Sequence, residues 1–248
     1  MRERNIRMRL AYDGTDFSGW QIQKNQRTVQ GVVAQALEQI HGHPVDLRAA
    51  GRTDSGVHAH GQVANFISDS TIPTGRFGLA LNTKLPRDVQ ALASDEVSDT
   101  FHSRYDARWR VYKYFIHNAP YDDPFSRRYS IIIKRKLDIN LLNVHAAALI
   151  GIHDFTTFSA AGDQSESKIR EIRNAVFYPE REFLVFRIVG NAFLWRMVRS
   201  ILGTLLEIEE SRRASGYLKS VLCARDRSLA GTTAQAKGLS LYQVGYDE

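Results

Sequence analysis

Strand-like and helix-like periodicities follow one another along this chain without a regular strand–helix–strand rhythm. Apolar and polar residues alternate over 6–12, which is typical of a strand with one buried face. From Thr28, a residue type that caps helices, apolar residues recur at helical spacing as far as Ile40. An irregular order of strands and helices favours an α+β fold with antiparallel sheets over a parallel α/β fold.

The same reading extends over the rest of the chain. We expect further strands at 45–50, 62–66, 111–116, 174–178, 183–189 and 239–246. We expect further helices at 138–150, 194–205 and 217–222, with Asp138 as an N-cap and Gly151 as a stop. The polar stretch 160–168 is typical of a mobile loop. At 248 residues the chain has room for one large domain or two medium ones.

Composition narrows the classes of function. No apolar run approaches the roughly 20 residues that span a bilayer, and the charged N-terminus leads directly into a strand pattern rather than a signal peptide. We therefore expect a cytoplasmic protein. Cys223 is the only cysteine, which excludes an internal disulfide and a cysteine-based zinc site, and we expect it to be a small core residue of a helix. A net charge of +6 favours a polyanionic partner such as nucleic acid.

The most unusual loop lies between two expected strands and reads Gly51-Arg52-Thr53-Asp54-Ser55-Gly56-Val57-His58. Its glycines allow a tight turn and the close approach of a ligand. The planar guanidinium of Arg52 suits a phosphate or a base that has left its stack. Asp54 is a candidate nucleophile or base, since a nearby cation would keep it ionised. An aspartate that merely closes an Asx-turn fits the same letters, and the residues alone leave both interpretations open.

This loop closely resembles the signature loop of the tRNA pseudouridine synthase A family. Further stretches resemble that family in the same order and extend over almost the whole chain; they are 12–21, 81–82, 85–86, 101–104, 107–108, 154–158, 191–194, 197–199, Gly203 and several positions between 226 and 241. One departure is 231–236, which carries threonine and glutamine where many members carry prolines. The departure concerns a C-terminal loop rather than any position of the expected site.

The resemblance implies that the chain isomerises uridine to pseudouridine at positions 38, 39 and 40 of the tRNA anticodon stem-loop. It implies an enzyme without metal or other cofactor, usually a homodimer, that binds tRNA and no membrane. It also implies two α/β halves with mixed, mainly antiparallel sheets, which form an extended sheet with a central active-site cleft. We place the halves at 1–105, with the aspartate loop, and 106–248, with the remaining site residues.

Four residues match the family's site positions. The resemblance implies that Asp54 is the catalytic nucleophile and that Tyr112 packs on the target base and exchanges its C5 proton. It implies that Arg199 pairs with the aspartate and that Arg52 helps to displace the base. Without the resemblance, Tyr112 would be a core tyrosine of a strand, Arg199 a buried arginine that needs a partner, and Arg52 a surface arginine. Whether Asp54 attacks the sugar, attacks the base or removes a sugar proton stays open.

Two other functions compete with the isomerase. A catalytically inactive tRNA-binding or RNA-chaperone protein of the same fold would need the basic surface but not Asp54, Tyr112 and Arg199 together. A nucleoside glycosidase is disfavoured because no second carboxylate motif serves the leaving group. His58 and His60 have no matching acid or cysteine pattern, so we expect no metal site there.

Overall fold

The structure, a computed structural model, describes residues 2–246. Its contacts divide the chain into two compact units, one formed by residues 2–108 with 240–246 and the other by 109–239. Each unit combines a mainly antiparallel sheet with helices, and each sheet also contains one parallel strand pair. The mixed α+β prediction is therefore confirmed.

The first unit is built on strands β1 (Arg4–Tyr12), β3 (His58–Ser68), β4 (Val89–Val97) and the part of β10 (Leu239–Gly245) from Ser240 on. β1 lies between β4 and β3 and pairs with both in antiparallel fashion, whereas β10 is parallel to β3. The short strand β2 (Arg48–Ala49) is antiparallel to β3 and pairs with its residues Ala64 and Asn65. Ile6, Met8 and Leu10 are completely buried, as the alternation along β1 predicts.

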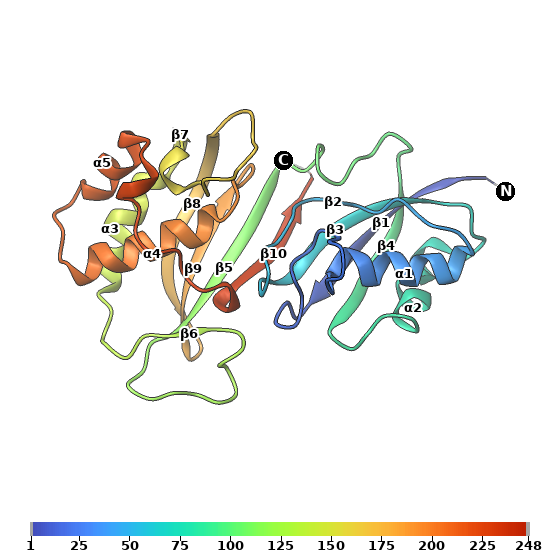
Figure 1. Cartoon of the computed structure of the whole chain (residues 1–248), viewed down its shortest axis with the longest axis horizontal. Coiled ribbons are helices and arrows are strands. Elements are labelled where there is room, and N and C mark those ends of the chain that lie inside the picture. Colours follow the sequence, from blue (N-terminus) through green and yellow to red (C-terminus); the bar gives the residue numbers. More distant parts are fainter. Residues whose placement is uncertain (1, 247–248) are drawn as a thin grey trace. The chain divides into compact units, whose positions relative to one another are not determined.

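Two helices accompany this sheet, α1 (Val29–His41) and α2 (Phe77–Asn82), and Figure 1 shows α1 running alongside the strands. Thr28 caps α1 as predicted, because its hydroxyl accepts a hydrogen bond from the Gly31 amide at 3.3 Å. The core of this unit includes the edge-to-face pair of Phe66 and Phe77, with ring centroids 5.5 Å apart.

The second unit holds the antiparallel order β5-β9-β8-β7, formed by β5 (Trp109–His117), β9 (Phe183–Gly190), β8 (Ile169–Glu180) and β7 (Gly151–Asp154). The two-residue strand β6 (Ile131–Ile132) runs parallel to β5. β8 and β9 form the predicted hairpin, and the stacked rings of Phe177 and Phe186 join them at 4.6 Å.

Three helices lie together against this second sheet, α3 (Ile139–Ala146), α4 (Met197–Glu210) and α5 (Tyr217–Ala224) (Figure 1). Asp138 caps α3 as predicted, but the α-helix ends at Ala146 and continues only as a 3₁₀ turn to Leu149. α4 begins later than its apolar spacing predicts because Arg196 adopts a left-handed backbone conformation, with φ of 60°.

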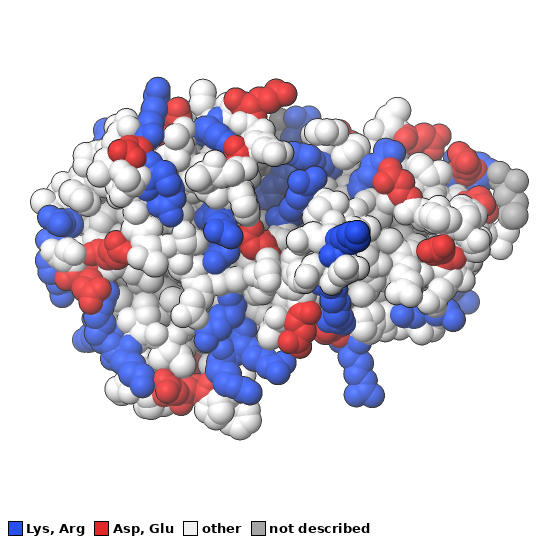
Figure 2. All heavy atoms as spheres, viewed as in Figure 1, with Lys and Arg blue, Asp and Glu red and all other residues white. Residues whose placement is uncertain are grey.

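The prediction for Cys223 is wrong: it lies in α5 as expected, but its side chain is exposed. The buried face of α5 is formed by Leu218, Val221 and Leu222, and the residue after Leu222 turns away from that face. No helix in the described part of the chain is long and apolar enough to cross a membrane. Lys and Arg side chains are spread over the face shown in Figure 2, with Asp and Glu among them.

Candidate active site

The loop that carries Asp54 joins β2 to β3 in the first unit and closes in a tight turn. The Val57 amide donates a hydrogen bond to the Asp54 carbonyl at 3.1 Å, which reverses the chain across Ser55 and Gly56. Asp54 is half-buried and Arg52 is exposed. The loop therefore presents an acid and a cation two residues apart, the acid partly withdrawn from water and the cation open to it.

Tyr12, at the end of β1, and the loop 13–20 that follows it form hydrogen bonds with the Asp54 loop. The Tyr12 hydroxyl lies 2.8 Å from the Thr53 hydroxyl, and the Trp20 amide donates to the Thr53 carbonyl at 3.0 Å. On the other side of Asp54 in the chain, the Ser55 hydroxyl donates a hydrogen bond to the Phe17 carbonyl at 3.2 Å. Hydrogen bonds on both residues that flank Asp54 hold its backbone in place before any substrate arrives.

Gly14 shows how closely the two loops approach each other. A Cβ atom added at Gly14 would lie 2.0 Å from the carbonyl oxygen of Val57, a distance that real carbon atoms do not reach. The position accepts only glycine unless the Asp54 loop moves. The stretch 12–21 thus acts as a close-fitting support for the loop.

His58, the last residue of the Asp54 loop motif, is part of the same support. Its Nδ1 atom accepts a hydrogen bond from the Gly14 amide at 3.0 Å and lies 3.2 Å from an Asp13 carboxylate oxygen. An amide can only donate, so Nδ1 accepts and the ring proton lies on Nε2. The buried His58 therefore has a structural role, because it joins the Asp54 loop to Asp13 and Gly14.

Tyr112 lies in the middle of β5, where it is opposite Ile188 of β9. It is 9% exposed, and its ring meets the ring of Phe193 edge to face at 5.1 Å, with an interplanar angle of 83°. Phe193 belongs to the segment that leads into α4. This contact fixes the orientation of the Tyr112 ring within the second unit.

Arg199 lies in the first turn of α4 and is bound to the C-terminal segment 231–238. Its Nε atom donates to the Ala234 carbonyl at 2.8 Å, while the Ala234 amide donates to the Arg199 carbonyl at 3.1 Å. Next to this pair, the Tyr114 hydroxyl donates to the Gln235 carbonyl at 2.6 Å. Burial raises the pKa of Tyr114 far above its usual range, and the positive charge of Arg199 offsets only part of that shift.

The close fit of α4 against this segment depends on Gly203. A Cβ atom there would lie 1.7 Å from the Thr232 carbonyl oxygen. The departure of 231–236 from the family's prolines therefore falls on a segment that backbone contacts already hold against α4.

The four residues predicted for the site are distributed over both units. Arg52 and Asp54 share one loop of the first unit, and Tyr112 and Arg199 belong to the second. Sequence reasoning did not identify the supporting contacts, namely Tyr12 with Thr53, Phe193 with Tyr112 and Ala234 with Arg199. The recurrence of these residues in the family-like stretches was the only signal that could have found them.

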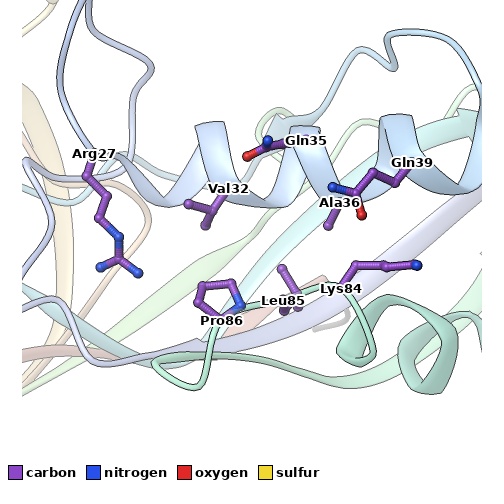
Figure 3. A pocket seen from close by; sticks show the side chains of 8 residues that line it. All are labelled: Arg27, Val32, Gln35, Ala36, Gln39, Lys84, Leu85 and Pro86. Atoms are coloured by element: carbon purple, nitrogen blue, oxygen red, sulfur yellow. The ribbon is translucent and has the colours of Figure 1, made fainter.

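A shallow groove of about 300 Å³ lies elsewhere in the first unit, between α1 and residues 84–86 (Figure 3). It is lined by none of the four predicted residues. Arg27, at one end, is engaged in a two-point ion pair with Asp88 at 2.8 and 2.9 Å and lies 3.9 Å from the centre of the Phe17 ring. Among residues 2–246, no three His, Cys, Asp or Glu side chains gather as a metal site would require.

Comparison with known proteins shows that the residues of these two loops and of α4 match one protein family. A family model described as tRNA pseudouridine synthase matches residues 9–106 and 145–247. The chain belongs to this family. Asp54, Arg52 and Arg199 fall inside the two matched stretches, and Tyr112 falls between them.

Individual members of the family are similar over nearly the whole chain. The tRNA pseudouridine synthase A of Treponema denticola is 44% identical over 99% of this chain and 94% of its own length. The proteins of the same name from Shouchella clausii and Moorella thermoacetica are 43% and 42% identical, over 97% of this chain and 92% and 99% of their own lengths.

Proposed function

We propose that this chain isomerises uridine to pseudouridine in tRNA, with Asp54 as the nucleophile. The observation that carries the proposal is the Asp54 loop itself, which matches the family's signature and is held on both sides of the acid by Thr53 and Ser55. A half-buried carboxylate on a rigid turn suits a nucleophile, and the exposed arginine beside it suits contact with a nucleic acid.

The reaction conserves every atom of the substrate. The bond between N1 and C1′ breaks, the uracil rotates, a bond between C5 and C1′ forms, and the proton on C5 is replaced by one on N1. No electrons are gained or lost, so the chemistry needs an ionised acid, a proton acceptor and protection from water. Asp54 supplies the ionised carboxylate whether it attacks the sugar, attacks the base or removes a sugar proton.

The other three residues have distinct roles in this proposal. Tyr112, whose ring orientation is set by Phe193, packs on the target base and exchanges its C5 proton. The resemblance assigns Arg199 to pair with Asp54, and Arg52 to take the place of the displaced base. Positions 38, 39 and 40 of the anticodon stem-loop are the target uridines. The family resemblance supports these assignments residue by residue.

We further propose that the enzyme works in the cytoplasm as a homodimer and uses no cofactor. A second subunit would supply contacts to the remainder of the tRNA. The net charge of +6 supports binding to the phosphate backbone by either subunit.

The direct test maps pseudouridine in an unmodified tRNA transcript after incubation with the purified protein, by carbodiimide-dependent stops in primer extension. We expect stops at positions 38 to 40 that disappear in Asp54→Asn. Asp46→Asn is the matched control, because Asp46 is a 74% exposed acid of the same unit that pairs with Arg48. Intact tRNA binding without any pseudouridine would replace this proposal by the RNA-binding alternative.

A further inference from the structure

Trp195 and Arg196 are two large, exposed side chains at the point where α4 begins. Trp195 is 45% exposed, and the Arg196 guanidinium lies 4.9 Å from the centre of its ring. Arg196 is exposed as well and holds a left-handed backbone conformation. An exposed indole beside a cation is a combination that binds an unpaired base and its phosphate.

The loop before β8 holds Trp195 in place through Asp163. The Asp163 carboxylate accepts hydrogen bonds from the Trp195 amide at 2.6 Å and from the Ser165 amide at 2.8 Å, and it pairs with the Lys168 ammonium. The Trp195 carbonyl accepts in turn from the Ala160 amide at 3.0 Å. The side chain of Asp163 is only 4% exposed, so a buried charge is used to fix the backbone of an exposed tryptophan.

Gly162 approaches the indole at the edge of the ring rather than over a face. A Cβ atom added at Gly162 would lie 2.9 Å from one ring atom, Cζ3, and 3.8 Å from each of its two ring neighbours. Equal distances of that size place the contact at the edge of the ring in its own plane, because an approach over the face would bring the neighbours closer. The loop thus supports the ring from its edge rather than stacking on it.

The position of the pair in the chain connects it to two residues of the proposed site. Phe193, two residues before Trp195, contacts the Tyr112 ring, and Arg199 follows three residues after Arg196. Tyr112 and Arg199 belong to the same unit as Trp195, and the short segment 193–199 carries all of these contacts. Trp195 and Arg196 therefore share one short segment with Phe193 and Arg199.

We propose that Trp195 and Arg196 form a binding site for one unpaired nucleotide of the RNA substrate, with its base stacked on the indole and its phosphate bound by the guanidinium. The site rests on the proposed function for the identity of the RNA, and it is held by the Asp163–Lys168 pair. It would hold a nucleotide other than the target uridine, whose base is assigned to Tyr112.

The test measures RNA binding and catalysis separately in the full-length protein. Anisotropy of a fluorescein-labelled anticodon-arm RNA gives the Kd, and pseudouridine mapping gives turnover. We expect Trp195→Ala to weaken binding about tenfold and Trp195→Phe to stay within about threefold of the parent, since a phenyl ring still stacks. Arg196→Gln should reduce the slope of log Kd against log salt by about one, the contribution of one phosphate contact.

A matched control is the second exposed arginine–aromatic pair of this unit, Arg213 over Tyr217 at 5.1 Å. Tyr217→Ala and Arg213→Gln should leave the Kd and the salt slope unchanged. Trp195 should also report binding directly: RNA should quench the tryptophan emission of Trp109→Phe, and this quenching should be lost in the double variant Trp109→Phe/Trp195→Phe, whose remaining tryptophan, Trp20, is 1% exposed.

Unchanged Kd in folded Trp195→Ala, or quenching that persists in Trp109→Phe/Trp195→Phe, would overturn the site. If Trp195→Ala does not fold, Trp109→Phe/Trp195→Phe and Arg196→Gln decide the matter through quenching and salt slope. The two proposals fail separately. Pseudouridine formation with parent-like binding by the variants removes the nucleotide site alone, whereas Trp195-dependent binding without pseudouridine removes the proposed reaction alone.

Discussion

The hydroxyl of Tyr12 lies 2.8 Å from the hydroxyl of Thr53, the residue immediately before Asp54, although 41 positions separate them in the chain. Burial raises the pKa of Tyr12 to about 12, even though hydrogen bonds with Thr53 and Gln62 act in the opposite direction. Tyr12 is therefore neutral throughout the physiological range and keeps its hydroxyl proton. A phenol at the end of β1 fixes the turn that presents the proposed nucleophile.

Tyr12→Phe should lower the free energy of unfolding by about 1 kcal/mol, the usual net value of one buried hydrogen bond. It should also lower kcat, because Thr53 loses the contact that holds the backbone next to Asp54. Chemical denaturation and single-turnover kinetics measure the two effects, with Tyr105→Phe, a 74% exposed tyrosine, as the control. Because the folded pKa is raised, the stability from Tyr12 is complete below pH 10 and is lost as pH rises from 10 to 12. A stability gap that widened over that range would contradict the assignment.

Gly14→Ala tests the close fit between the two loops. The new methyl group would lie 2.0 Å from the Val57 carbonyl oxygen, so the Asp54 loop has to shift, and we expect a loss of about 1–3 kcal/mol in stability. Turnover should fall more than tRNA binding, since the acid moves while the basic surface stays. Gly75→Ala is the control because a Cβ atom there meets nothing within 4 Å. Equal turnover in the two variants would show that the loops do not support each other.

Much of the fold could be predicted from periodicity because its elements have one clearly buried face. Thr28, α1, the hairpin of β8 and β9, and α5 all follow from local spacing and capping. β4 was missed because its burial alternates only at its start and its second half is largely exposed. The late start of α4 was missed because the backbone conformation of Arg196 leaves no trace in an apolar pattern.

The residues of the candidate site could be predicted from the sequence, but the contacts that hold them could not. The Asp54 loop stands out in the letters, but its contacts with Tyr12, Trp20 and Phe17 join segments that periodicity treats as independent. The same is true of Arg199 and Ala234, 35 positions apart. Long-range backbone contacts of this kind arise only once the core is packed, so a resemblance can point to the residues but not to what holds them.

Tyr112 and Tyr114 lie two positions apart on β5, and only the Tyr112 hydroxyl is proposed to take part in the reaction. The Tyr114 hydroxyl bonds the Gln235 carbonyl at 2.6 Å, so Tyr114→Phe should lower the free energy of unfolding by about 1 kcal/mol. Tyr112→Phe should lower kcat, because the hydroxyl is proposed to serve in proton exchange. Thermal denaturation and single-turnover kinetics on both variants provide the comparison. A larger kcat loss in Tyr114→Phe would transfer the proposed role to that residue.

Asp163→Asn tests the charge that holds Trp195 in place. Burial alone would raise the pKa of Asp163, but hydrogen bonds from Lys168, Trp195 and Ser165 together hold it far below its ordinary value of 3.8. Asparagine has the same shape without the charge, so we expect the free energy of unfolding at pH 7 to fall by about 1.5–3 kcal/mol. Asp46→Asn, at an exposed position, should have little effect.

The pH dependence of this difference decides whether the charge is responsible. The folded pKa of Asp163 is depressed, so its stabilisation is fully present above pH 4 and is lost as pH falls below the unfolded value toward the folded one. The gap between the parent and Asp163→Asn should therefore be constant from pH 7 to about 5 and should shrink between about pH 4 and pH 2. Denaturation curves at each pH measure it. A gap as large at pH 2 as at pH 7 would mean that the asparagine disturbs packing, and that the paired carboxylate is not what holds Trp195.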